Sequence, residues 1–291
     1  MLTIDCQVHP FAAETADKKW THAHDDGRKS VNGDEMVMAM DAVGVDGGIA
    51  VSPRGMYGFD PSYVVTVQKA HPDRFAIVRP VDAKDPAVGE QIAEWKRTAG
   101  AVAVRLMMGG GAVEADAPGI ATICKEATRH GLGINLQLGG NLNEKTMSVV
   151  DRFPDTRFAL DHLAFRQPRK MPATPEAWAD LPKLLDLAKR PNAFVKVSGA
   201  CAMSAQPYPY DDIFDNLLRV FDAFGFERCM WGTDWTRTYT LFPYINAVDP
   251  FRLSKRISES DKVKLMGETC AKFYNWKPKS TYQQRHPHGR D

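Results

Sequence analysis

The sequence lacks an excess of charge of either sign, and it lacks a long apolar run. Its 291 residues include 37 Lys and Arg against 36 Asp and Glu, which gives a formal net charge of +1. We therefore expect no nucleic-acid partner and no attraction to an anionic membrane surface. No segment approaches the roughly 18 apolar residues that span a bilayer. Asp5 and His9 interrupt the only apolar stretch near the start, so no secretory signal is expected.

Cysteine is scarce and scattered. The five cysteines are Cys6, Cys124, Cys201, Cys229 and Cys270, and none belongs to a C-x-x-C pair. This spacing favours free thiols in a reducing compartment, so it predicts a cytoplasmic protein and argues against a structural zinc cluster. Hydrophobic residues still make up 44% of the chain and aromatic residues 10%. That content excludes disorder over the whole chain and supplies a large core.

Short apolar runs recur along the chain, and most are followed by a stretch with helical patterning. They are continuous rather than alternating, which is typical of strands covered on both faces. The runs are Leu2–Val8, Gly47–Val51, Phe75–Val81, Ala101–Leu106, Leu132–Leu138, Arg157–Leu160, Ala193–Val197 and Cys229–Trp231. The expected helices are Asp34–Val43, Pro61–Ala70, Pro118–His130, Pro175–Ala188, Asp211–Phe224 and Asp261–Phe273. Eight strands with intervening helices predict an α/β fold, a (β/α)8 TIM barrel.

No linker divides the sequence, so residues 1–276 are expected to form one barrel domain. The polar tail 277–291 has almost no apolar residues and is expected to be disordered or only loosely docked. The long polar loop Phe11–Gly33 is a candidate for the rim of an active site. It contains His22 and His24, for which a solvated surface pair is the simpler interpretation.

Polar residues collect where the strands end. In a (β/α)8 barrel the catalytic groups come from these carboxyl ends and from the loops that follow them. The residues in question are Asp5, Gln7 and His9 on strand 1, Arg54 after strand 2, Arg105 on strand 4, Gln137 on strand 5, Asp161 and His162 after strand 6, Lys196 and Ser198 on strand 7, and Asp234 after strand 8. Two histidines and an aspartate at one rim could polarise a carbonyl group and activate water.

Three motifs in this order carry a resemblance to a known family. The segments IDCQVHPF, LDH and WGTDW stand on the first, sixth and eighth predicted strands. Over about Leu2–Trp276 the chain resembles the amidohydrolase-2 group of the amidohydrolase superfamily. The resemblance implies the same barrel fold. It also implies either a zinc-dependent decarboxylase or a lactonase, such as the 2-pyrone-4,6-dicarboxylate hydrolases.

The resemblance also bears on metal binding. The family pattern on strand 1 is D-x-H-x-H, in which Asp5 and His9 match but Gln7 replaces the first histidine. Gln137 stands where metal-binding members often carry a histidine on strand 5. The remaining family ligands, His9, His162 and Asp234, could hold a divalent ion such as zinc only weakly, because an amide is a poor substitute for imidazole. We therefore expect no tightly bound metal, as in the pyrone-dicarboxylate hydrolases.

The same resemblance implies roles for the site residues. Asp234 would be the general base for water, and burial between Trp231 and Trp235 could raise its pKa. His9 and His162 would polarise the carbonyl group, with Gln7 as a helper. The alternatives left open are a capping or ion-pairing role for Asp234 and ordinary buried hydrogen bonding for the other three.

Several cationic and amide side chains are candidates for binding an anionic substrate. Arg105, Arg54 and Arg166 each follow a strand end, and a guanidinium group suits a carboxylate. Gln137 and Lys196 complete this set. Lys196 alternates with Val195 and Val197, so it should face the barrel interior and pair with Asp234 or Asp5. Any of the arginines could instead form only a salt bridge.

These observations favour a hydrolase that opens a small, anionic lactone or related cyclic ester. Two alternatives remain: a metal-dependent decarboxylase of the same family, and a barrel that binds a ligand without catalysis. The expected partner is a small anionic molecule, and a homo-oligomer is left open.

Overall fold

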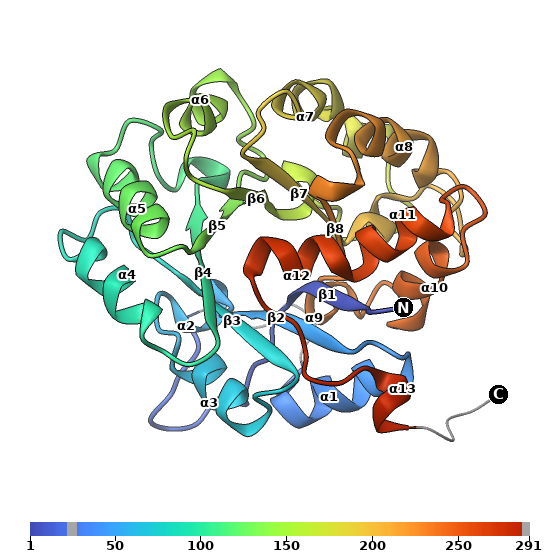
Figure 1. The fold of residues 1–291 in the computed structure, drawn as a ribbon, viewed down its shortest axis with the longest axis horizontal. Coiled ribbons are helices and arrows are strands. Elements are labelled where there is room, and N and C mark those ends of the chain that lie inside the picture. The colour runs from blue at the N-terminus through green and yellow to red at the C-terminus, as the bar shows by residue number, and fades with distance from the viewer. Residues whose placement is uncertain (22–27, 287–291) are drawn as a thin grey trace.

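Eight parallel strands form a nearly closed barrel in the computed structural model, which describes residues 1–21 and 28–286 (Figure 1). They follow one another around the barrel in chain order, which confirms the predicted fold. The strands are β1 (Ile4–Val8), β2 (Gly47–Val51), β3 (Phe75–Pro80), β4 (Ala101–Met107), β5 (Gly133–Gln137), β6 (Phe158–Leu160), β7 (Ala193–Ser198) and β8 (Cys229–Gly232). The backbone N–H of Asp234 donates to the carbonyl of Gln7 at 3.0 Å and ties the end of β8 to β1.

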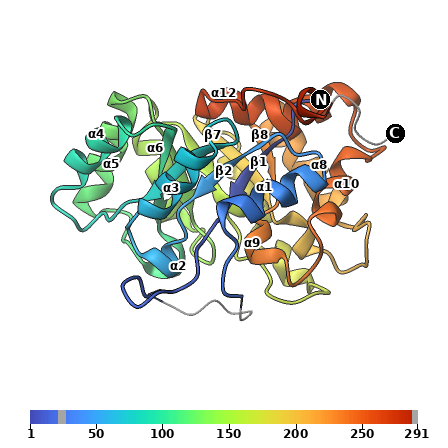
Figure 2. The same ribbon diagram turned by 90° about the horizontal axis from the view of Figure 1, so that it is seen from below.

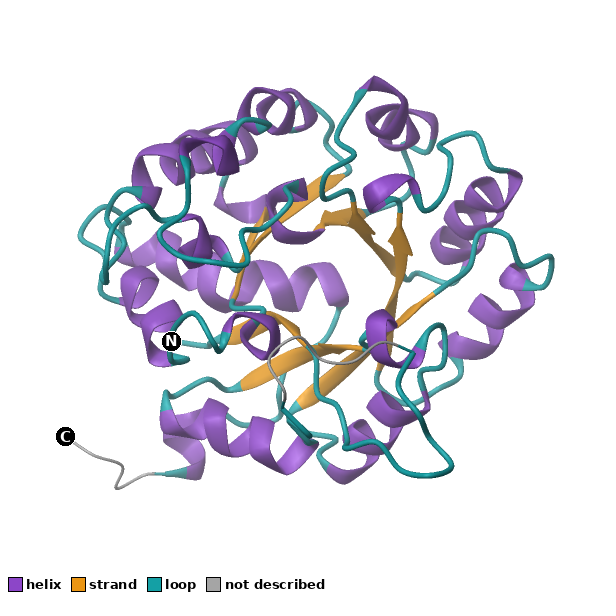
Figure 3. Cartoon of the chain, turned by 180° about the vertical axis from the view of Figure 1, so that it is seen from behind, coloured by secondary structure: helices purple, strands orange, loops and turns teal. Residues whose placement is uncertain are grey.

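Helices surround the ring of strands (Figure 3). They are α1 (Gly33–Ala42), α2 (Arg54–Tyr57), α3 (Ser62–Ala70), α4 (Val88–Lys96), α5 (Pro118–Arg129), α6 (Glu144–Arg152), α7 (Leu181–Leu187), α8 (Ile213–Phe224), α9 (Trp235–Thr238), α10 (Ile245–Arg252), α11 (Glu259–Val263), α12 (Thr269–Tyr274) and α13 (Tyr282–Arg285). The predicted helix Pro175–Ala188 is interrupted: a 3-10 turn at Pro175–Trp178 precedes α7. The predicted helix Asp261–Phe273 contains a π-helical turn at Lys264–Glu268 between α11 and α12.

Strand side chains alternate between two buried layers. Val195 and Val197 on β7 join the large core between strands and helices, whereas Lys196 points into the barrel. The interior layer contains small and medium apolar residues such as Cys6, Val78 and Met230. This alternation is the period of two expected for a strand, and it confirms the inward direction predicted for Lys196.

The two ends of the barrel differ. Helix α12 lies across one end, and α2 and α9 lie at the opposite end (Figure 2). On α12, the Tyr274 hydroxyl donates to Asn135 Oδ1 at 2.8 Å, and its ring lies 5.7 Å from Lys196 Nζ. Tyr274 therefore closes the barrel floor, and the carboxyl ends of the strands are left to form the site. All five cysteines are buried free thiols.

The described part of the polar tail contains one short helix and contacts α1. Thr281 caps the short helix α13, and Arg285 pairs with Asp41 on α1 at 3.2 Å. Residues 287–291 of the tail, and the loop residues His22 and His24, lie outside the described residues. Within the described parts of the chain, no helix is long and apolar enough to cross a membrane.

Candidate active site

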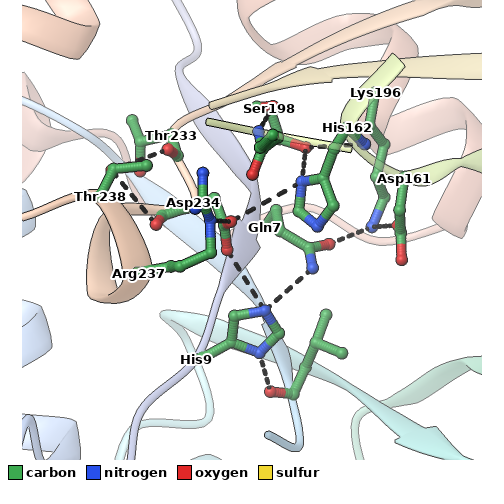
Figure 4. A network of polar contacts seen from close by, with 12 residues as sticks. Gln7, His9, Asp161, His162, Lys196, Ser198, Thr233, Asp234, Arg237 and Thr238 are labelled. Atoms are coloured by element: carbon green, nitrogen blue, oxygen red, sulfur yellow. Dashed lines mark hydrogen bonds and ion pairs between the residues drawn. The ribbon is translucent and has the colours of Figure 1, made fainter. Parts of the chain in front are cut away.

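Asp234 stands at the centre of a polar cluster at the end of β8 (Figure 4). Its side chain is almost fully buried, and its backbone adopts a left-handed conformation with φ of 52°. The preceding residue, Thr233, donates its backbone N–H to Asp5 Oδ1 at 2.9 Å. Tyr244 donates its hydroxyl to Asp5 Oδ2 at 2.8 Å. Asp5 thus joins β1 to the segment that carries Asp234, and burial raises the pKa of Asp5 to about 6.

His9 and Gln7 approach Asp234 from β1 and the residues after it. His9 Nδ1 lies 2.7 Å from the carbonyl oxygen of Val51, so this nitrogen carries a proton and donates it. His9 Nε2 lies 3.3 Å from Asp234 Oδ1 and 3.1 Å from Gln7 Nε2. Gln7 is fully buried. Two of the predicted residues therefore converge on the predicted base.

His162 reaches the same cluster from a turn after β6. Three consecutive residues of this turn, His162, Leu163 and Ala164, have φ values of 55°, 59° and 60°. His162 Nδ1 lies 2.9 Å from Ser198 Oγ and 3.8 Å from Asp234 Oδ2. Its Nε2 lies 3.5 Å from an Arg105 nitrogen. The structure thus brings His162 to Asp234 as well.

A buried ion cluster lies beside these groups. Asp161 is fully buried between two cations: Arg105 Nε at 2.7 Å and Lys196 Nζ at 3.1 Å. Lys196 also donates to Gln7 Oε1 at 2.7 Å. The partner expected for Lys196 was Asp234 or Asp5, and the structure corrects this to Asp161. Asp161 precedes His162 directly, so the turn after β6 supplies both groups.

Arg237 on α9 is the functional candidate that the sequence analysis missed. Its Nε donates to Asp234 Oδ2 at 2.8 Å, and its Nη1 donates to the carbonyl of Pro168 at 3.3 Å. Its Nη2 is buried and has no hydrogen-bond partner. The only signal in the sequence was its position three residues after Asp234, which directly precedes the four-residue helix α9.

The charges around Asp234 correct the expectation that its pKa is raised. Burial alone would raise the pKa of Asp234, but His162, His9 and Arg237 outweigh it, so this pKa lies well below its ordinary value. Trp231 plays no part, because it packs in the core between strands and helices. Burial lowers the pKa of His162 to about 4, so this ring is neutral at pH 7. Lys196 and Arg105 hold the pKa of Asp161 far below its usual range despite burial.

The residues predicted to bind substrate occupy three kinds of position. Arg105 is buried against Asp161 and is not an open anion site. Arg54 lies in a cleft of about 90 Å³, shared with Lys84 and Asp82, where its guanidinium group stacks 4.8 Å from the Phe59 ring. The other two lie nearer the surface: Arg166 is exposed, and Gln137 accepts the N–H of Gly109 at 3.2 Å. Their binding roles remain predictions.

A second, more open groove has a volume of about 520 Å³, and most of its lining residues follow Asp234 in the sequence. It is lined by aromatic residues after β8, with Trp235 stacked on Tyr244 at 5.1 Å between ring centroids. Arg28, from the long loop after β1, lies 3.2 Å from the ring centroid of Tyr239. This loop therefore reaches the rim, as its polar composition predicted.

Comparison with known proteins shows to which family the chain belongs. The amidohydrolase family model matches residues 4–276, nearly the whole described barrel. The chain belongs to the amidohydrolase family. The resemblance found in its three motifs is thereby confirmed. Of the curated proteins, 4-sulfomuconolactone hydrolase from Hydrogenophaga intermedia is 27% identical over 206 residues, which are 69% of this chain and 64% of that protein. The match spans less than two thirds of that relative's length.

Solved structures show the same fold. An amidohydrolase from Burkholderia multivorans has a TM-score of 0.79 at 21% identity, covering 94% of this chain and 99% of that one. A probable 2-pyrone-4,6-dicarboxylic acid hydrolase from Acinetobacter baumannii, with citric acid bound, has a TM-score of 0.76 at 19% identity, covering 95% and 100%. A 5-carboxyvanillate decarboxylase from Sphingomonas paucimobilis has a TM-score of 0.66 at 17% identity, covering 94% and 99%. These likenesses concern the fold alone.

The residues of this family member do not fit a zinc ion in the arrangement observed. Zinc prefers four nitrogen, sulfur or carboxylate ligands, and here Arg237 engages Asp234 Oδ2 while Lys196 engages the amide oxygen of Gln7. His162 Nδ1 faces Ser198. Within residues 1–21 and 28–286, no three His, Cys, Asp or Glu side chains are grouped to hold a metal. Arg237 and Lys196 therefore engage oxygen atoms that a metal ion would need as ligands.

Proposed function

We propose that this protein is a hydrolase that opens a small, anionic lactone or related cyclic ester, with Asp234 as the base and without a resident metal. The observation that carries the proposal is the state of the Asp234 carboxylate. Its Oδ2 is held by Arg237, while its buried Oδ1 has no hydrogen-bond donor and lies 3.3 Å from His9 Nε2. A carboxylate with one fixed and one available oxygen is suited to orient a water molecule.

The reaction follows from these positions. A water molecule at Oδ1 would lose a proton to the Asp234–His9 pair while its oxygen forms a bond to the lactone carbonyl carbon. The carbonyl oxygen gains negative charge and needs a hydrogen-bond donor there. Collapse of this intermediate breaks the ring C–O bond, and the leaving oxygen takes back the proton. The product is an open-chain hydroxy acid or its keto tautomer.

Two observations support an anionic substrate. The rim carries cations outside the buried cluster, among them Arg54 and Lys84 at one cleft and the exposed Arg166. Two proteins to which the chain is similar are named for lactones with acidic groups, a sulfomuconolactone and a pyrone dicarboxylic acid. Guanidinium groups bind carboxylates and sulfonates through paired hydrogen bonds.

The experiment is hydrolysis of a lactone panel by purified protein, followed by ultraviolet absorbance and by mass spectrometry of the products. The panel contains 2-pyrone-4,6-dicarboxylate, 4-sulfomuconolactone and muconolactone, with an uncharged δ-lactone as the matched neutral control. We expect at least one anionic lactone to be opened, and we expect EDTA to leave the rate unchanged. Release of carbon dioxide from an aromatic acid, abolished by EDTA, would instead support the decarboxylase alternative.

Asp234→Asn is the variant that tests the base. The amide keeps the size of the side chain but cannot accept a proton, so we expect kcat to fall by at least about 100-fold. Asp186→Asn serves as the control, because Asp186 pairs with Lys189 and Arg190 and with no residue of the Asp234 cluster. Turnover of Asp234→Asn at the wild-type rate would remove Asp234 from the mechanism.

A further inference from the structure

We infer that Arg237, rather than the two histidines, polarises the scissile carbonyl group. This inference rests on the proposed function and assigns a catalytic role to a residue outside the motifs that define the family resemblance. It follows from asking which N–H groups near Asp234 remain available to a substrate oxygen. The answer depends on the proton positions that the buried contacts impose.

Lys196 determines the orientation of the Gln7 amide. An ammonium group can only donate, so the Gln7 atom at 2.7 Å from Lys196 Nζ is the oxygen. The Gln7 NH2 group is then the donor that faces His9 Nε2 at 3.1 Å. Because His9 Nδ1 already donates to Val51, the neutral ring has only a lone pair at Nε2. A protonated ring would direct its Nε2 proton to Asp234 Oδ1 at 3.3 Å. In neither state does His9 keep a proton for a carbonyl oxygen.

The same reasoning applies to His162. Its Nε2 faces the Arg105 guanidinium group at 3.5 Å, and guanidinium nitrogens only donate, so this nitrogen carries the lone pair. The proton is on Nδ1, where Ser198 Oγ lies 2.9 Å away. His162 therefore also lacks an N–H that points to a bound carbonyl group.

Arg237 has the donor that the histidines lack. The Nε–H and one Nη2–H of a guanidinium group point in the same direction and form a two-pronged fork. Asp234 Oδ2 occupies the Nε prong at 2.8 Å, while Nη2 is buried without a partner. The vacant prong lies beside the catalytic carboxylate, and the side chain is 32% exposed, against 1% for Asp234. Arg237 Nη2 and Asp234 Oδ1 are both buried and both lack a hydrogen-bond partner, so a carbonyl oxygen at the first and a water molecule at the second would satisfy them.

With Arg237 as the donor, each step of the hydrolysis is assigned to a named group. Water gives its proton to the Asp234–His9 pair, its oxygen bonds to the carbonyl carbon, and the resulting oxyanion accepts a hydrogen bond from Arg237 Nη2. When the ring C–O bond breaks, the electron pair leaves with the ring oxygen, which takes the proton. No oxidant, reductant or metal is needed. The fixed positive charge of Arg237 would stabilise the oxyanion, which is the role that a Lewis-acidic metal has in metal-dependent enzymes.

The test compares Arg237→Lys, Arg237→Ala and the control Arg129→Met, whose side chain is 73% exposed on α5. Substrate is the panel lactone that the wild type opens, and circular dichroism confirms the fold of each variant. Removing one oxyanion donor costs about 100- to 1000-fold in kcat in other enzymes, so we expect a loss of that order in Arg237→Ala with little change in KM. Arg237→Lys can still pair with Asp234 but has no second prong, so it should also lose most of the activity.

Chemical rescue separates this role from a structural one. Methylguanidinium added to Arg237→Ala can refill the space and supply the missing N–H donors, so kcat should recover at least 10-fold. Methylammonium, the matched additive with one cationic head, should not restore it. Full activity of Arg237→Lys, or a rise in KM alone, would overturn the inference while leaving the proposed hydrolysis intact. A wild type that opens no lactone in the panel would overturn both.

Discussion

Asp161→Asn should destabilise the barrel more than most single substitutions. Asp161 is the only carboxylate within ion-pair distance of both Arg105 Nε, at 2.7 Å, and Lys196 Nζ, at 3.1 Å, among the residues that the structure describes. The substitution leaves two buried cations facing a neutral amide. Breaking a buried ion pair by removing one partner costs about 3–5 kcal/mol. For a domain of this size each kcal/mol lowers Tm by roughly 2–4 °C, so we expect a fall of at least about 6 °C.

The measurement is the free energy of unfolding from urea titration, together with Tm from circular dichroism. Asp180→Asn is the matched control, because Asp180 pairs with Lys183 at the surface and its loss should change stability little. The double variant Asp161→Asn/Lys196→Met removes one of the stranded cations, so it should be more stable than Asp161→Asn alone. A loss below about 1 kcal/mol in Asp161→Asn would refute the view that this carboxylate compensates the buried charges.

Two further predictions concern packing and pH. Gly119→Ala should lower Tm by several degrees, because a Cβ at Gly119 would overlap the carbonyl oxygen of Ala83; Gly55→Ala, which meets open space, is the control for thermal unfolding. Stability should also fall steeply below about pH 4. The pKa values of Asp161 and Asp234 are lowered in the folded state, so their contribution is complete above the unfolded value near 3.8 and is lost as the pH falls below it. Urea titrations between pH 5 and pH 3 check this, and an unchanged midpoint would contradict it.

The barrel could be predicted because its strands are buried on both faces. The run Gly47–Val51 is apolar throughout, and Ala193–Val197 is apolar apart from Lys196; each coincides with a strand to within one residue. Helix α6 (Glu144–Arg152) was not among the predicted helices, because its sequence EKTMSVVDR is mostly polar and buries only one narrow face. Local sequence carries little signal for such a helix, and its packing against the barrel decides its position.

The sequence predicted which residues form the site better than it predicted how they pair. Asp234, His9, His162 and Gln7 were found from motifs at strand ends, and the structure brings them together. What the sequence could not supply was which group pairs with which. The inward direction of Lys196 follows from alternation, but its partner Asp161 stands on a turn 35 positions earlier in the chain. Only the closed barrel sets that distance.

The sign of the Asp234 pKa change was missed for the same reason. Neighbouring Trp residues in the sequence suggested an apolar environment, whereas the barrel places Arg237 and two histidines around the carboxylate. Arg237 itself belongs to a four-residue helix and to no motif. Through-space electrostatics depend on the rotation of each strand and turn, which a linear pattern does not specify.

The left-handed residues at the ends of β6 and β8 have an energetic consequence for the whole molecule. His162, Leu163, Ala164 and Asp234 all have positive φ without being glycine, and each such residue costs roughly 1–2 kcal/mol. Together they amount to a sizeable fraction of the 5–15 kcal/mol by which domains are usually stable. Glycine would relieve this cost at any of these positions, but it would also give the backbone more accessible conformations. Tyr210 and Asn275 also have positive φ elsewhere in the chain, but the run of three such residues falls on the turn that carries the buried histidine, so this backbone strain is densest at the proposed site.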